Sequence, residues 1–173
     1  TAPTADASSD TTAAIGDSVG FDASGSSDNV GITSYEWDVD NDDRYEKSGQ
    51  TISHTFGSTG AKTVTLRVKD AAGNTATDSI AVTVADAEPP TADAGSDKTG
   101  SLGDSVTFDA SGSSDNVGID RYEWDLDGDG TYETTGKRVS KSYAELGTTT
   151  VTVRVEDAAS NTATDTVEVA VED

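Results

Sequence analysis

The sequence predicts an all-β protein made of two tandem β-sandwiches. Three observations support this fold: the chain repeats itself at an offset of 87 residues, apolar residues alternate with polar ones, and no segment of useful length has helical periodicity. A short strand with one apolar face buries that face against a second sheet, so a sandwich is the expected arrangement.

The repeat divides the chain into two units, residues 1–86 and 87–173. Residues 22–32 return unchanged as residues 109–119, and residues 35–38 return as residues 122–125, without any gap. The linker, at about residues 85–90, contains two consecutive prolines, which stiffen a connection of this kind.

Four alternating runs mark strands in each unit. Thr and Val dominate them, and β-branched side chains fit a half-buried pleated surface. Gly- and Ser-containing turn signals separate the runs. The single tryptophan of each unit lies in the middle of a run, so we interpret it as a core anchor. In the first unit the runs contain Val19, Phe21 and Ala23, then Tyr35, Trp37 and Val39, then Val64, Leu66 and Val68, then Ile80, Val82 and Val84.

The composition excludes several classes of protein. The chain has 33 acidic and 11 basic side chains and a formal charge of −22, so nucleic acids and anionic membranes would repel it. It has no Cys and one His, which excludes disulfides and multi-His metal sites, and no run is apolar enough for a membrane helix. The absence of Met indicates a piece of a longer protein. Abundant Asp with little Lys resembles halophilic, haloarchaeal proteins, and high salt would screen the repulsion.

Several motifs together resemble the PKD (polycystic kidney disease) domain. In the second unit they are residues 90–95, 103–109, 111–115, 122–125 and 150–157. The resemblance covers essentially the whole of both units. It implies an immunoglobulin-like sandwich of seven strands, found as tandem modules in extracellular proteins and attached to secreted proteases, chitinases and surface-layer proteins.

We therefore expect seven strands in each unit and a head-to-tail arrangement of the units. An odd number of up-and-down strands sends the chain out at the pole opposite to its start. In the first unit the strands are expected to begin near Thr4, Ser18, Thr33, Arg44, Thr51, Lys62 and Thr75.

An acidic loop in the second unit has the spacing of a calcium loop. Asp125, Asp127 and Asp129 stand at alternate positions and Gly130 permits a sharp turn, while Thr131 could offer its carbonyl and Glu133 its carboxylate. The bidentate Glu of a full EF-hand is absent. The alternative interpretation is a solvated acidic turn.

The first unit has a poorer version of this loop. Its carboxylates are those of Asp38, Asp40, Asp42 and Glu46, but Asp43 and Arg44 replace the Gly-Thr pair. A left-handed Asp is unfavourable, and Arg44 could neutralise the loop without a metal.

A second set of candidates follows from topology. In an immunoglobulin-like sandwich the loop after the second strand and the loop between the last two strands share the N-terminal pole. The resemblance supports calcium at this pole, whereas Asp and Asn also cap turns without metal. The candidates are Asp28, Asn29, Asp70 and Asn74 in the first unit and Asp115, Asn116, Asp157 and Asn161 in the second.

The linker contains two further candidate calcium ligands, Asp86 and Glu88. We expect the Asp38–Glu46 loop to lie at the C-terminal pole of its unit, near these linker carboxylates. Like charges brought together are unfavourable, so calcium there would cross-link the junction and stiffen it.

Catalysis fits poorly, because the carboxylates lie in polar, exposed runs and no phosphate loop or nucleophile arrangement is present. We predict a non-enzymatic, extracellular or cell-surface module that acts as a calcium-stiffened spacer or adhesion segment adapted to high salt. Its expected partners are Ca²⁺, neighbouring domains of a larger surface protein, and another surface protein or a polysaccharide. The alternative is an accessory substrate-binding module of a secreted hydrolase, binding carbohydrate or protein.

Overall fold

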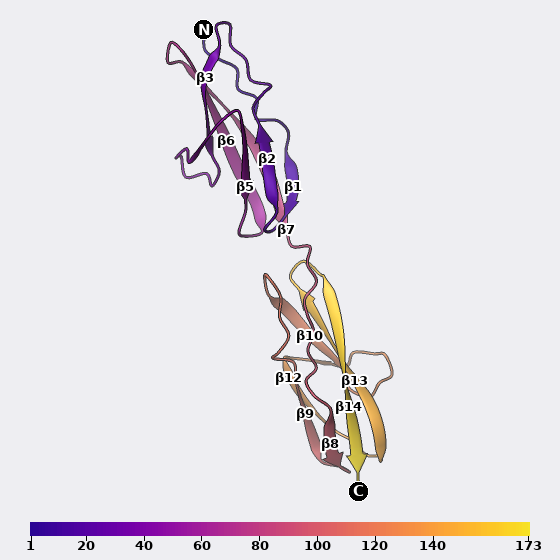
Figure 1. Cartoon of the computed structure of the whole chain (residues 1–173). Helices are drawn as coiled ribbons and strands as arrows, with labels where there is room; N and C mark the ends of the chain where they lie inside the picture. Colours follow the sequence, from indigo (N-terminus) through magenta and orange to yellow (C-terminus); the bar gives the residue numbers. More distant parts are fainter. The chain divides into compact units, whose positions relative to one another are not determined.

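The computed structural model describes residues 1–173, which form two compact units, Thr1–Asp86 and Ala87–Asp173. All regular structure is β-strand, and no helix is present that could cross a membrane. Within each unit the strands run lengthwise and the chain leaves at the pole opposite to its start (Figure 1).

The first unit has the seven strands expected of an immunoglobulin-like sandwich. One sheet has the order β1-β7-β6-β3-β4 and the other pairs β2 with β5. The strands are β1 (Thr11–Ala14), β2 (Ser18–Asp22), β3 (Ile32–Asp38), β4 (Lys47–Ser48), β5 (Thr51–Thr55), β6 (Gly60–Asp70) and β7 (Thr75–Ala85).

The second unit repeats this topology. Its larger sheet has the order β11-β10-β13-β14-β8, and β12 pairs with β9. The strands are β8 (Lys98–Ser101), β9 (Ser105–Asp109), β10 (Ile119–Asp125), β11 (Thr134–Thr135), β12 (Arg138–Ser142), β13 (Gly147–Asp157) and β14 (Thr162–Glu172).

A tryptophan forms the centre of each core. Trp37 and Trp124 are fully buried, and the Trp37 ring packs 5.8 Å from that of Phe21. Each indole Nε1 donates a hydrogen bond to a backbone carbonyl, that of Gly49 at 2.9 Å and that of Gly136 at 2.8 Å. The interpretation of both tryptophans as core anchors is confirmed, because a buried indole N–H needs a partner.

The first strand begins later than the sequence predicts. Thr4 makes only a two-residue bridge with Ser27, and β1 starts at Thr11, parallel to β7. Carboxylates fasten the segment between them: Asp78 accepts a hydrogen bond from the Ala7 N–H. The fourth strand also starts later, at Lys47, because residues 39–46 belong to the acidic loop.

The position of the acidic loop differs from the prediction as well. Asp38, the last residue of β3, pairs with Thr65, which is midway along β6. The loop therefore leaves the sheet on the flank of the unit and not at its C-terminal pole. The strand after Trp37 is too short to reach the pole, because Asp38 turns the chain, as described below.

Candidate cation-binding sites

The acidic loops are organised by one buried carboxylate each. Asp38 is 3% exposed, and its Oδ1 accepts hydrogen bonds from the N–H groups of Asn41 (2.7 Å) and Asp42 (3.3 Å). Its Oδ2 accepts one from the N–H of Asp43 (3.0 Å). Both oxygens therefore satisfy backbone donors of the turn, as a buried carboxylate requires.

Asp125 has the same role in the second unit. Its oxygens accept hydrogen bonds from the N–H groups of Gly128 (2.7 Å) and Gly130 (2.9 Å). Burial alone would raise the pKa of Asp125, but the hydrogen bonds from Gly130 and Gly128 outweigh it, so the pKa lies below its ordinary value. Asp125 is ionised at neutral pH and holds the loop in place.

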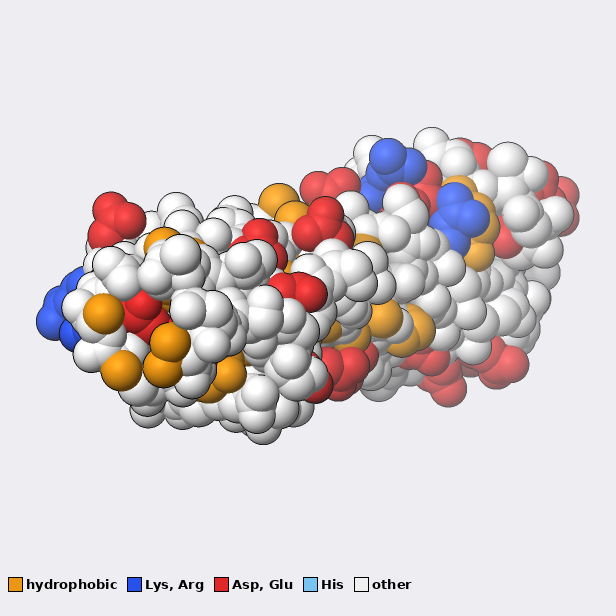
Figure 2. Space-filling view, turned by 90° about the horizontal axis from the view of Figure 1, so that it is seen from above, with side chains coloured by type: hydrophobic (Ala, Val, Ile, Leu, Met, Phe, Trp, Pro, Cys, Tyr) orange, Lys and Arg blue, Asp and Glu red, His pale blue; other side chains and the backbone are white.

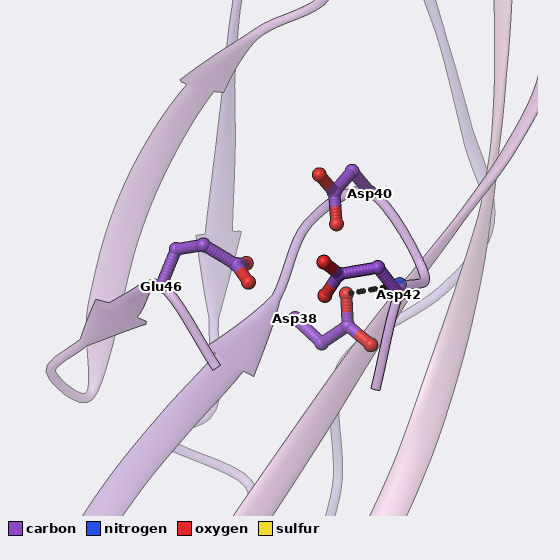
Figure 3. A group of neighbouring side chains, drawn as sticks. All are labelled: Asp38, Asp40, Asp42 and Glu46. Atoms are coloured by element: carbon purple, nitrogen blue, oxygen red, sulfur yellow. Dashed lines mark hydrogen bonds between the residues drawn. The ribbon is translucent and has the colours of Figure 1, made fainter. Parts of the chain in front are cut away.

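The other carboxylates of each loop lie close to its buried aspartate, Asp38 or Asp125. Oxygens of Asp38, Asp40, Asp42 and Glu46 lie within 4.8 Å of one another, and the last three side chains are exposed (Figure 3). The equivalent group is Asp125, Asp127, Asp129 and Glu133. Glu46 Oε2 also accepts a hydrogen bond from the Val39 N–H, so this side chain closes the loop. The sets that the sequence singled out do come together.

The groups opposite the two loops differ. In the second unit Lys141 Nζ, on β12, lies 3.3 Å from Asp127 Oδ2 and supplies a counter-charge to the loop. His54 occupies the position of Lys141 in the first unit, where it lines a hollow of about 410 Å³ together with Asp40 and Asn41. No ion pair involves Arg44, so the alternative in which Arg44 neutralises this loop is not found. Sequence reasoning missed this ion pair because Lys141 and Asp127 lie on different segments that only the fold brings together.

The N-terminal pole of each unit holds a pair of aspartates. Asp70 and Asp157 are almost fully buried, and Asp28 and Asp115 are half-buried. Asp28 Oδ2 accepts hydrogen bonds from the N–H groups of Val30 (2.8 Å) and Gly31 (3.0 Å), and Asp115 Oδ2 is bonded in the same way. Hydrogen bonds from Gly31 and Val30 hold the pKa of Asp28 below its ordinary value.

One oxygen of each pair has no partner. Oδ1 of Asp28 and Oδ1 of Asp115 are inaccessible to solvent and make no hydrogen bond. In the second unit the carboxylates of Asp115 and Asp157 have oxygens within 4.8 Å of each other. A buried, ionised oxygen without a donor is unfavourable unless something positive lies against it. This position is suited to a hard cation.

The asparagines of this pole act as braces. Asn74 donates from its Nδ2 to Asp70 Oδ2 at 2.7 Å, and its backbone N–H bonds Asp70 Oδ1. This side-chain hydrogen bond is the main cause that lowers the pKa of Asp70, against burial and the charge of Asp28. Asn161 holds Asp157 in the same way. Asn29 accepts a hydrogen bond from the Thr1 hydroxyl, whereas Asn116 is exposed.

The remaining predicted residues are Thr131, Glu88 and Asp86. Thr131 is exposed, and its N–H donates a hydrogen bond to Asp129 Oδ1 at 2.7 Å. The carbonyl of Glu88 accepts a hydrogen bond from Asn161 Nδ2 at 3.4 Å. Asp86 is half-buried and ends the first unit.

Comparison with known proteins gives consistent results. The model of the PKD domain family matches residues 1–84 and again residues 87–171. Chitinase A1 of Niallia circulans is 32% identical over 171 residues, which are 93% of this chain and 24% of that protein. The chain thus spans about a quarter of the length of this relative.

Among solved structures, immunoglobulin domains 1 and 2 of DIP-gamma align with a TM-score of 0.54 and 12% identity, over 100% of this chain and 99% of that one. The PKD domain of the KIAA 1837 protein is 29% identical over 51% of this chain and 91% of that one, with a TM-score of 0.41.

Proposed function

Because this chain belongs to the PKD domain family, with two copies in tandem, we propose that it is a non-enzymatic, extracellular spacer or adhesion segment stabilised by calcium. Its units are immunoglobulin-like modules of the binding type and not catalytic folds. An extracellular location is supported by the match to the PKD domain family together with the similarity to Chitinase A1.

The calcium proposal rests on the unpartnered oxygens of Asp28 and Asp115. Ca²⁺ takes six to eight oxygen ligands and favours carboxylates. The neighbouring carboxylate in each unit, Asp70 or Asp157, is held ionised by its asparagine brace. A cation at this pole would contact the unpartnered oxygen and balance two buried charges. The acidic loops are weaker candidates, since the buried carboxylate of each is already bonded to backbone N–H groups.

The test is thermal unfolding of the full chain in calcium or chelator at constant ionic strength. Calcium at about 100 times its dissociation constant would add about 2.7 kcal/mol to the free energy of unfolding. The double variant Asp28→Asn with Asp115→Asn keeps an acceptor for the loop N–H groups but replaces the unpartnered oxygen, so it should lose most of the shift.

A matched control is Asp10→Asn with Asp97→Asn. These carboxylates fasten the first strand of each unit by accepting a hydrogen bond from Ala81 or Glu168, far in sequence from the candidate sites. The control removes the same two charges and should retain the calcium shift. An equal calcium shift in both double variants would refute the assignment to the N-terminal poles.

Stiffening by calcium is proposed for the linker. Glu88, Pro89 and Pro90 lead into Thr91, whose backbone exchanges hydrogen bonds with that of Ser114, next to the candidate ligand Asp115. A cation that orders this pole would also order the end of the linker. X-ray scattering in high salt should differ between calcium and chelator, and identical profiles would leave the chain a plain spacer.

Adaptation to high salt is a further part of the proposal, supported by the formal charge of −22. Screening should raise the melting temperature between about 0.1 and 3 M KCl in metal-free buffer. Many carboxylates accept hydrogen bonds from backbone N–H groups, so only the other, exposed carboxylates contribute to this rise in melting temperature. A flat melting temperature would exclude this adaptation.

A further inference from the structure

The second unit has a hollow on the flank of its larger sheet, and several residues around it differ from those at the same places in the first unit. It measures about 380 Å³ and lies where β10 meets β11. Its lining residues are Asp120, Arg121, Tyr122, Glu123, Thr135 and Gly136. Hollows of this size hold small ligands when an aromatic side chain and a few directed polar groups meet there.

Six substitutions distinguish this region from its counterpart; two of them place Thr134 and Thr135 where the first unit has Lys47 and Ser48. Thr33, Ser34, Gln50 and Thr51 of the first unit are replaced by Asp120, Arg121, Lys137 and Arg138. The tyrosine, Tyr35 or Tyr122, is unchanged. In the second unit Arg121 lines the hollow and Lys137 lies by the Tyr122 ring.

The charged groups around the hollow are only partly used within the protein. Glu123 is held by Arg154, with Nη2 at 2.6 Å. Arg138 is paired with Asp109 and lowers the pKa of that carboxyl to about 2. Arg121 approaches its partners no closer than 3.6 Å from Glu123 and 3.9 Å from Glu156, and its side chain is 52% exposed. Arg121 therefore remains available to a ligand.

The tyrosine ring and a lysine stand together at the same place. Lys137 Nζ lies 5.7 Å from the centroid of the Tyr122 ring, and Lys137 is exposed. The ring offers an apolar surface, Arg121 and Lys137 offer hydrogen-bond donors, and Asp120 offers acceptors.

We propose that this hollow binds a neutral saccharide chain. A pyranose has apolar C–H faces and hydroxyl groups that both donate and accept hydrogen bonds, which matches a tyrosine ring bordered by cations and a carboxylate. The unit as a whole carries 19 acidic and six basic side chains, so a strongly anionic polymer would be repelled. This inference deepens the accessory-module alternative and is independent of the calcium proposal.

The experiment uses the full chain and two neutral probes, cellohexaose and chitohexaose, followed by amide NMR at about 0.15 M salt. We expect saturable shifts at residues 120–123 and 134–137 with at least one probe, and none at residues 33–36 and 47–50. The two probes distinguish a glucose polymer from an N-acetylglucosamine polymer.

The first unit supplies the matched variants. Arg121→Ser with Lys137→Gln gives the second unit the residues found at the same places in the first, where the sandwich accommodates them. Losing two charge-assisted contacts should weaken binding by about tenfold or more without lowering the melting temperature. The reciprocal variant, Thr33→Asp with Ser34→Arg and Gln50→Lys, should create saccharide-dependent shifts in the first unit.

The result that would overturn the proposal is the absence of saturable shifts with either probe at millimolar concentration. Binding that the Arg121→Ser, Lys137→Gln variant leaves unchanged would also overturn it. Shifts produced only by alginate or by poly-glutamate would replace it with an acidic polysaccharide or an acidic peptide as the ligand. None of these outcomes bears on calcium binding, which is measured separately by the melting shift.

Discussion

The acidic loop of the first unit (residues 38–46) and that of the second (residues 125–133) place their carboxylates alike but differ in backbone and counter-charge. Asn41 and Asp43 have positive φ values of 62° and 67°, where Gly128 and Gly130 have 77° and 87°. The same turn thus forms with and without glycine. The buried carboxylate at its start compensates for the left-handed residues by accepting their N–H groups.

The loop that has a basic partner is the second one, whereas the sequence suggests the first. Arg44 is next to the acidic residues along the first chain segment, yet it pairs with none of them, whereas Lys141 reaches Asp127 from β12. A loop with a resident ammonium group needs an added cation less. The first loop, which the sequence predicts to be the poorer calcium site, is therefore the one with more uncompensated charge.

The largest effect is expected from removing the organising carboxylate. Asp38→Asn replaces an acceptor by an amide donor that faces the buried N–H of Asp43, so the free energy of unfolding of the first unit should fall by about 2 kcal/mol or more. Asp125→Asn should cost less, because glycines relieve the backbone of the second loop. Amide hydrogen exchange measures the free energy of unfolding of each unit separately and so checks both expectations.

Asp40→Asn is the control for this comparison, since Asp40 is exposed and belongs to the same loop. It should change the free energy of unfolding by less than about 0.5 kcal/mol. Equal losses for Asp38→Asn and Asp40→Asn would show that net charge, and not the buried hydrogen bonds, organises the loop.

A smaller effect is expected from exchanging the backbone residues. Asn41→Gly with Asp43→Gly should stabilise the first unit by about 1 kcal/mol, because glycine adopts positive φ without steric cost. The reverse exchange, Gly128→Asn with Gly130→Asp, should destabilise the second unit by more. A Cβ at position 128 would lie 2.9 Å from the carbonyl oxygen of Thr150. Urea unfolding of both variants checks this, and a less stable first unit or a more stable second unit would contradict it.

The smallest effect concerns the opposing residues. Lys141→His should cost the second unit less than about 1 kcal/mol, as expected for an exposed ion pair. The same change should increase calcium binding by the second loop, because it removes the resident cation. Calorimetric titration in the Asp28→Asn, Asp115→Asn background would isolate the loop, and a lower affinity after the change would contradict this expectation.

His54 adds a pH dependence to the first unit. Burial, followed by the charge of Lys47, lowers the pKa of His54 below its ordinary value of 6.5. As the pH falls, the unfolded chain therefore takes up a proton on His54 before the folded chain does. The free energy of unfolding that neutral His54 contributes is complete above pH 6.5 and decreases as the pH falls through this value. Melting between pH 5 and 8 should show this slope in the natural protein and not in His54→Gln.

Much of the fold could be predicted from local sequence. The alternation around Trp37 and Leu66 places these side chains on one face, and the 87-residue repeat makes the second unit a copy of the first. The carboxylate groups at residues 38–46 and 125–133 also follow from spacing along one chain segment, because alternate residues of a tight turn converge. These features depend on neighbours in sequence, so the sequence by itself determines them.

Only the tertiary structure decided what depends on packing between distant segments. The parallel pairing of β1 with β7 moves the first strand from Thr4 to Thr11, and the pairing of Asp38 with Thr65 moves the acidic loop to the flank. The burial of Asp28 Oδ1, the approach of Lys141 to Asp127 and the hollow beside Tyr122 each join elements that local periodicity treats separately. Burial and charge pairing are properties of the three-dimensional neighbourhood, and a periodic pattern specifies only which face a residue is on.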